Sequence, residues 1–68
     1  MDVSYKRLWH LLLDKNMKKK DLEQAAGISH YMMNKMSRNE NISTETVGKI
    51  CQVLQCTPEQ IMEFIFEK

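Results

Sequence analysis

Apolar residues recur every three or four positions along most of the chain, which is the spacing that buries one face of a helix. Between Leu22 and Met36, two such stripes are interrupted by Gly27 and Ser29. Glycine adopts the left-handed conformation that ends a helix, and serine accepts from the free amides that begin the next helix. The pattern therefore predicts two short helices joined by a tight turn, with the outer face of the second helix in solvent.

The same periodicity predicts four helices before residue 57. The first covers about residues 3–15 with Asp2 or Ser4 as its cap, the second starts at residues 18–21, the third spans 30–37, and the fourth follows Ser43 or Thr44. Their expected inner faces carry, in order, Tyr5, Leu8, Trp9 and Leu12; Leu22, Ala25 and Ala26; Met32, Met33 and Met36; and Val47, Ile50, Cys51 and Leu54. Methionines at this spacing fill a core, although an exposed methionine surface for partners is the alternative.

A fifth helix is predicted to begin at Thr57, because threonine, then proline, then glutamine three positions after the threonine form a capping-box sequence. Its apolar residues cover more width than one small domain can bury, so part of it is expected to meet a second subunit. The residues expected at this dimer interface are Met62, Phe64, Ile65 and Phe66.

The absence of alternating β-branched runs, repeats and linkers predicts an all-α fold, a compact five-helix bundle. The 68 residues are expected to form a single domain over residues 1–68, with the helix-turn-helix at about residues 19–37. A chain shorter than ~70–80 residues rarely gains more than ~3–5 kcal/mol from its own core, which also favours a partner subunit.

Several classes of protein do not fit the sequence. Apolar runs are too short for a membrane span or a signal-peptide core, so we expect a cytoplasmic protein. Cys51 and Cys56 lack a metal-ligand spacing, and His10 and His30 do not complete one, so neither a metal site nor a cofactor is expected. An enzyme is not expected, because no catalytic constellation or small-molecule substrate is evident and a domain this small is not expected to hold a large pocket.

Charge is distributed unevenly along the chain. Residues 1–38 contain eight basic and four acidic residues, a net charge of +4, whereas residues 39–68 contain two basic and five acidic residues, a net charge of −3. The basic half coincides with the helix-turn-helix, as expected of a surface that faces phosphates; solvated lysines without a partner are the alternative. Lys18, Lys19 and Lys20 also oppose the dipole of the helix that they begin, and a bound phosphate would relieve that conflict.

The order of these segments resembles the lambda-repressor-like, or Xre/Cro-type, helix-turn-helix regulators. The resemblance covers nearly the whole chain and is carried by residues 20–29 (KDLEQAAGIS), by Met33 and Met36, and by residues 47–54 (VGKICQVL). Two positions depart from the family pattern: Glu23 replaces a small alanine that faces the third helix, and Lys18 replaces a hydroxyl cap. Glu23 therefore either tilts outward or changes the packing of the two helices.

The resemblance implies that the third helix enters the major groove of DNA. The residues at the family's base-contact positions are Ser29, His30, Tyr31, Asn34 and Lys35. The residues expected to contact phosphates are Lys18, Lys19, Lys20, Arg38, Asn39 and Asn41. Asparagine can pair with adenine, lysine with guanine, and tyrosine with a thymine methyl, while histidine can reach a base edge or a phosphate. Packing of Tyr31 over the turn, and idle surface for Asn34 and Lys35, are the alternatives.

The favoured hypothesis is a sequence-specific DNA-binding transcriptional regulator that reads an inverted-repeat operator in double-stranded DNA as a homodimer. The alternative is a protein-interaction module, such as an antitoxin, on the same fold. The apolar C-terminal segment favours the alternative, and the lysine cluster with the polar third helix favours DNA binding.

Overall fold

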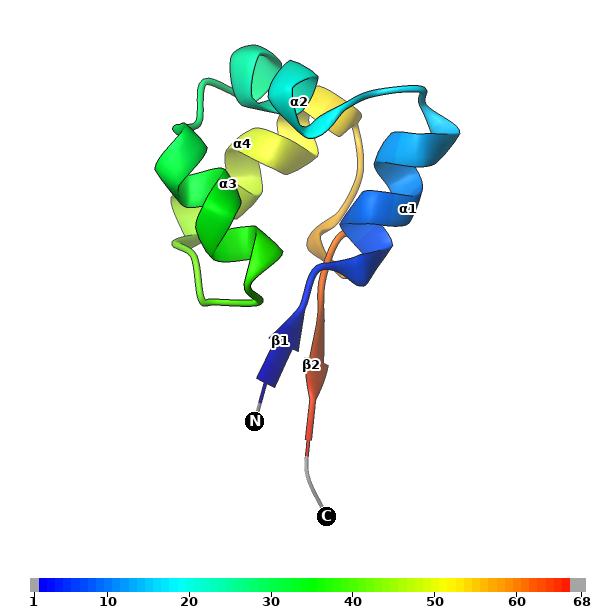
Figure 1. The fold of residues 1–68 in the computed structure, drawn as a ribbon. Coiled ribbons are helices and arrows are strands. Elements are labelled where there is room, and N and C mark those ends of the chain that lie inside the picture. The colour runs from blue at the N-terminus through cyan, green and yellow to red at the C-terminus, as the bar shows by residue number, and fades with distance from the viewer. Residues whose placement is uncertain (1, 67–68) are drawn as a thin grey trace.

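Four helices surround one apolar core, and a two-stranded antiparallel sheet extends from one end of the helical body (Figure 1). A computed structural model describes residues 2–66. The elements in chain order are β1 (Asp2–Ser4), α1 (Lys6–Asp14), α2 (Lys19–Ala26), α3 (His30–Ser37), α4 (Thr44–Leu54), the 3-10 turn η1 (Pro58–Gln60) and β2 (Glu63–Ile65).

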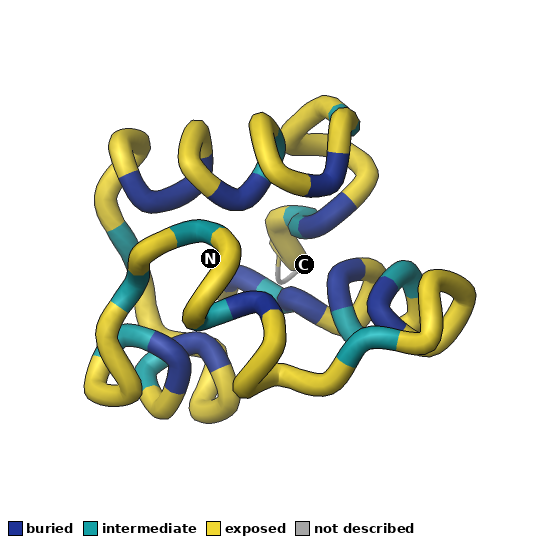
Figure 2. Tube along the Cα trace, turned by 90° about the horizontal axis from the view of Figure 1, so that it is seen from above, coloured by how far each residue is buried: buried dark blue, intermediate teal, exposed yellow. Residues whose placement is uncertain are grey.

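The core is formed by side chains from all four helices and from both ends of the chain. Figure 2 shows the buried segments turned toward one another and the exposed segments outward. The buried hydrophobic residues are Val3, Tyr5, Leu8, Leu12, Leu22, Met33, Met36, Val47, Ile50, Leu54 and Ile61. Most of the predicted inner faces are thereby confirmed. Trp9, Ala26 and Cys51 are half-buried and pack against this core, whereas Met32 is half-buried and Ala25 is exposed.

The prediction for the first helix was wrong at its N-terminal end. Residues 2–4 form β1, and α1 begins at Lys6 after Tyr5. Neither Asp2 nor Ser4 caps the helix, although Ser4 Oγ accepts from the Lys6 amide at 3.3 Å. The reason is non-local: Tyr5 is fully buried and its hydroxyl donates to the Glu40 carbonyl at 2.7 Å, which fixes the chain in an extended path before the helix.

The predicted fifth helix is absent, so the five-helix bundle was wrong: the described chain has four α-helices and a small sheet. The capping signal works locally, since the Thr57 amide donates to Gln60 Oε1 at 2.9 Å, but it starts only the single 3-10 turn η1. Ile61 then enters the core, and the next residues pair with β1 in the register Asp2↔Ile65, Val3↔Phe64 and Ser4↔Glu63. Phenylalanine and isoleucine suit a strand once a partner strand is present.

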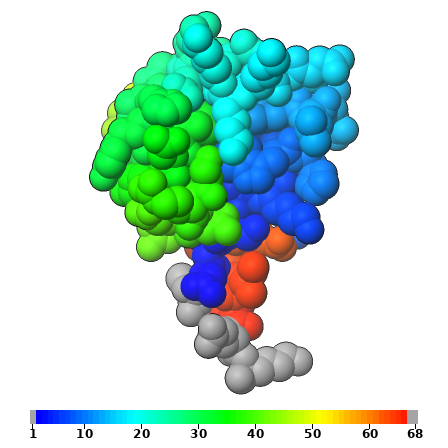
Figure 3. Space-filling model, viewed as in Figure 1, coloured from blue at the N-terminus to red at the C-terminus, as the bar shows by residue number. Residues whose placement is uncertain are grey.

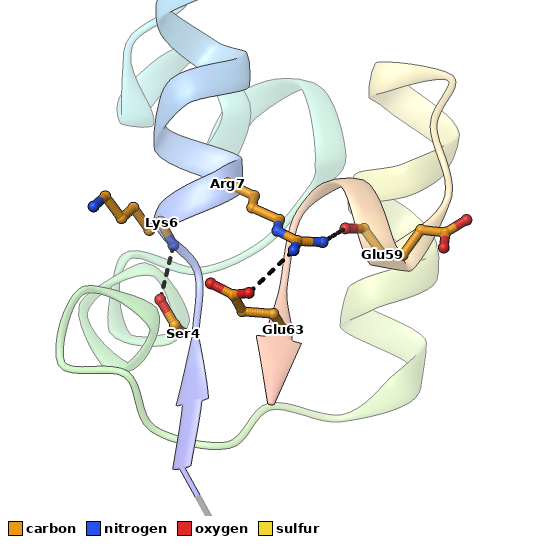
Figure 4. Close-up of polar contacts among 5 residues, drawn as sticks. All are labelled: Ser4, Lys6, Arg7, Glu59 and Glu63. Atoms are coloured by element: carbon orange, nitrogen blue, oxygen red, sulfur yellow. Dashed lines mark hydrogen bonds and ion pairs between the residues drawn. The ribbon is translucent and has the colours of Figure 1, made fainter. Parts of the chain in front are cut away.

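Arg7 joins α1 to the segment that returns at the other end of the chain (Figure 4). Its guanidinium donates to the Glu59 carbonyl at 2.8 Å and to the Glu63 carboxylate at 3.1 Å. Both side chains of the ion pair are about half exposed, so the pair contributes at most about 1 kcal/mol. Its main effect is to orient β2 beside β1.

An open apolar groove lies where the sheet meets the helices, contrary to the expectation that so small a domain holds no large pocket. Its volume is about 870 Å³. The apolar residues along it include Val3, Ile42, Val47, Met62 and Phe64. Phe64, which lines the groove, is 52% exposed, and Phe66, two residues later, is 71% exposed, so both aromatic rings are largely uncovered.

Candidate nucleic-acid interface

The turn between α2 and α3 follows the geometry that its sequence predicts. Gly27 ends α2 in the left-handed region with φ of +67°, and the amides of Gly27 and Ile28 both donate to the Glu23 carbonyl. Ser29 then caps α3, because its hydroxyl oxygen accepts from the Met32 amide at 3.1 Å. The predicted bounds of the third helix are confirmed at both ends.

The helix α3 has one anchored face and one open face. Met33 and Met36 are almost fully buried and attach the helix to the core. His30, Tyr31 and Asn34 are exposed on the outside, and Lys35 is half-buried. Tyr31 is 68% exposed, and the Lys35 ammonium lies 5.9 Å from the centre of its ring, so the tyrosine is not packed away over the turn.

The predicted lysine cluster lies at the N-terminus of α2. Lys18 is the N-cap, and its backbone amide donates to the Asp21 carboxylate at 2.9 Å. Lys19 is held in place, because its ammonium donates to Ser37 Oγ at 3.0 Å and lies 4.3 Å from the centre of the Trp9 ring. Lys19 therefore connects α1, α2 and the end of α3. Figure 3 shows these three elements side by side on one face of the molecule. Within residues 2–66, Lys18 and Lys20 form no ion pair.

Two residues of the loop after α3 already form contacts within the domain. The Arg38 guanidinium pairs with the Glu40 carboxylate, and this hydrogen bond lowers the pKa of Glu40. Asn39 adopts a left-handed conformation, and its side-chain oxygen accepts from the Tyr5 amide at 3.5 Å. Asn41 is exposed. Of the three residues expected to contact phosphates here, Arg38 and Asn39 are thus already engaged within the domain.

Comparison with known proteins places this geometry in a family. Residues 7–67 match the model of the Cro/C1-type helix-turn-helix DNA-binding domain. The chain belongs to this Cro/C1-type family. It is also similar to a crystal structure of the transcriptional regulator VanUg, with 41% sequence identity and a TM-score of 0.93 over 97% of this chain and 88% of the VanUg chain. No curated protein matches the sequence.

Glu23 is the residue of this Cro/C1-type domain that sequence reasoning did not place in the site. Its side chain is only 16% exposed and does not tilt outward; its carboxylate lies 3.2 Å from Nδ1 of His30. The sequence does carry a signal for Glu23: it places a carboxylate where the family pattern has alanine, seven residues before His30, the first residue of α3. What the sequence left open was the direction of the side chain.

The residues that the structure describes offer few other candidate functional sites. Residues 2–66 hold no cluster of three or more potential metal ligands. Cys51 and Cys56 are free and half-buried, and burial raises the pKa of the Cys51 thiol to about 11. Among the described helices, none combines the length and the apolar character needed to cross a bilayer.

Proposed function

We propose that this protein is a sequence-specific transcriptional regulator that inserts α3 into the major groove of double-stranded DNA. The observation that carries the proposal is the exposed polar face of α3 beside the lysine cluster, on a helix anchored by Met33 and Met36. A rigid helix with free polar side chains can reach base edges, while neighbouring ammonium groups attract the phosphate backbone.

Several polar residues of α3 and its N-cap have a chemical role in this proposal. Asn34 pairs with adenine through two hydrogen bonds, Lys35 donates to guanine, and Tyr31 packs on a thymine methyl. Ser29 retains its hydroxyl hydrogen for an acceptor on DNA, because the oxygen accepts from Met32. Lys18, Lys19 and Lys20 bind phosphates, with Lys19 already positioned by Ser37 and Trp9. Arg38 contributes less, since Glu40 balances its charge.

The proposed regulator acts as a homodimer through the groove and the aromatic surface beside it. Phe64 lies directly opposite the buried Val3 in the sheet and lines the groove with it, and the exposed ring of Phe66 follows two residues later. A sheet of two strands is marginal on its own and leaves strand edges free, which a second copy can cover. A standard protein interface buries ~800 Å² per partner. The proposed dimer interface must therefore include the groove with Met62 as well as the two strands.

The DNA-binding proposal is tested by selecting bound sequences from randomised duplex DNA. We expect an inverted repeat with half-sites ~34 Å apart, one helical turn of DNA. Replacing Asn34 and Lys35 with alanine should abolish selective binding while the circular dichroism spectrum stays unchanged. Lys49→Ala is the control, because Lys49 lies on α4 and pairs with Glu45. Failure to enrich any sequence, or undiminished selective binding by the double variant, would contradict the proposal.

The dimer is tested by Phe66→Glu, which places a charge on the 71% exposed ring position. Light scattering should show a dimer for the unmodified protein and a monomer for this variant. Leu13→Glu is a matched control, since Leu13 is 72% exposed but lies at the C-terminal end of α1. A monomeric unmodified protein, or equal dissociation by both variants, would reject this interface.

A further inference from the structure

We infer that Glu23 sets the hydrogen-bonding character that His30 presents to DNA, so that the start of α3 selects a base with a hydrogen-bond donor. The inference rests on the proposed DNA-binding function and adds a positioning residue to it. Its basis is the contact between the Glu23 carboxylate and Nδ1 of His30, at 3.2 Å.

Glu23 is well placed to fix the ring. Its backbone carbonyl accepts from the amides of Gly27 and Ile28, so the turn itself holds the residue. Its carboxylate reaches the first residue of α3 and is 16% exposed, whereas the His30 side chain is 76% exposed. Glu23 thus accepts the hydrogen bonds that close α2 and also contacts the first residue of α3 through Nδ1, while most of the His30 side chain stays exposed.

The chemistry of the pair determines which nitrogen carries the hydrogen. A carboxylate only accepts hydrogen bonds, so Nδ1 must donate to Glu23. In its neutral form an imidazole has a single N–H, so Nε2 of a neutral His30 is an acceptor. A phosphate oxygen offers no hydrogen to such an acceptor. In the major groove, adenine and cytosine present amino donors, whereas guanine presents only acceptors. The neutral His30 is thus directed to adenine or cytosine and away from guanine and phosphate.

Glu23→Gln tests this assignment with almost no change in shape. The amide of glutamine can donate to Nδ1, which permits the tautomer with hydrogen on Nε2. Sequence selection at about pH 8, where histidine side chains are neutral, should give adenine or cytosine at one operator position for the unmodified protein. For Glu23→Gln, discrimination against guanine at that position should fall by about tenfold, the effect of one base contact. In a His30→Ala background, Glu23→Gln should change no base preference.

A measurement on the free protein keeps the inference testable if the variant folds poorly. Long-range nitrogen–proton correlation in nuclear magnetic resonance distinguishes the two tautomers, and His10→Gln assigns the signals because His10 is the other histidine. We expect His30 in the Nδ1–H form. An Nε2–H form would overturn the inference.

The outcomes separate this inference from the proposed function. If the unmodified protein enriches no operator, both fail. If it enriches an operator whose base preferences are the same for Glu23→Gln, DNA binding stands and the role of Glu23 is overturned. A uniform loss of affinity over all sequences would likewise assign Glu23 a purely structural role and overturn the inference.

Discussion

At the scale of single residues, the two glycines of the chain have equally open surroundings but different backbone conformations. Gly27 occupies the left-handed region, whereas Gly48 lies inside α4, and a Cβ atom at either position would meet no atom within 4 Å. Backbone conformation alone therefore decides the effect of adding a methyl group.

Gly27→Ala should lower the free energy of unfolding by about 1 kcal/mol, because alanine is strained in the left-handed conformation. Gly48→Ala should raise it by about 0.5–1 kcal/mol, because alanine favours the helix. Urea denaturation at one protein concentration measures both changes. Effects of the same sign would mean that packing, and not conformation, governs these positions.

Tyr5 should make the free energy of unfolding depend on pH in the alkaline range. Burial raises its pKa above the ordinary value of 10.0, so the folded state favours the neutral phenol. This stabilisation is complete below pH 10 and is lost as the pH rises through the pKa of the folded state. Thermal denaturation should show this loss, and Tyr5→Phe should reduce its alkaline slope while costing about 1 kcal/mol at neutral pH through the lost bond to Glu40. An identical alkaline slope in the variant would exclude Tyr5 as the cause.

At the scale of elements, Ser29 and Ser43 provide a matched comparison. Each serine caps a helix by accepting from an amide three residues later, at 3.1 Å for Ser29 and 3.2 Å for Ser43. Either serine replaced by alanine should lower the free energy of unfolding by about 1 kcal/mol. Only Ser29→Ala should also weaken DNA binding in a mobility-shift assay, since Ser43 lies before α4. Equal effects on binding would assign both to stability alone.

The elements also show what sequence alone can predict. The end of α2 and the start of α3 were predicted because Gly27 ends the first helix and Ser29 begins the second through bonds within a few residues. The strands were missed because each is three residues long, and each exists only by pairing with a segment at the other end of the chain. The predicted capping box at Thr57 is present, but it starts only a three-residue turn, because a start signal does not determine how far a helix continues.

The candidate site likewise combines features that the sequence predicts with contacts that it does not predict. Exposure of His30, Tyr31 and Asn34 followed from helical spacing. The contacts of Lys19 with Trp9 and of Glu23 with His30 could not be predicted, because they join different helices whose relative placement the spacing does not give.

At the scale of the whole molecule, the uneven charge should appear in the salt dependence of DNA affinity. Each neutralised phosphate contributes about −0.9 to the slope of log K against log salt concentration. Lys20→Gln should therefore reduce the steepness by about 1 per subunit and weaken binding to all sequences alike. Titrations at several salt concentrations measure this, with Lys49→Gln as the control. A slope near zero for the unmodified protein would contradict phosphate binding by the lysine cluster.

The pairing of β1 with β2 also bears on the order of events during biosynthesis. The helices can form as they are translated, but Val3 has no partner until Phe64 has been made and has left the ribosome. The surface proposed to join two subunits therefore forms only after α1 to α4 have been made. A nascent chain in which Phe64 has not yet emerged cannot dimerise through this surface.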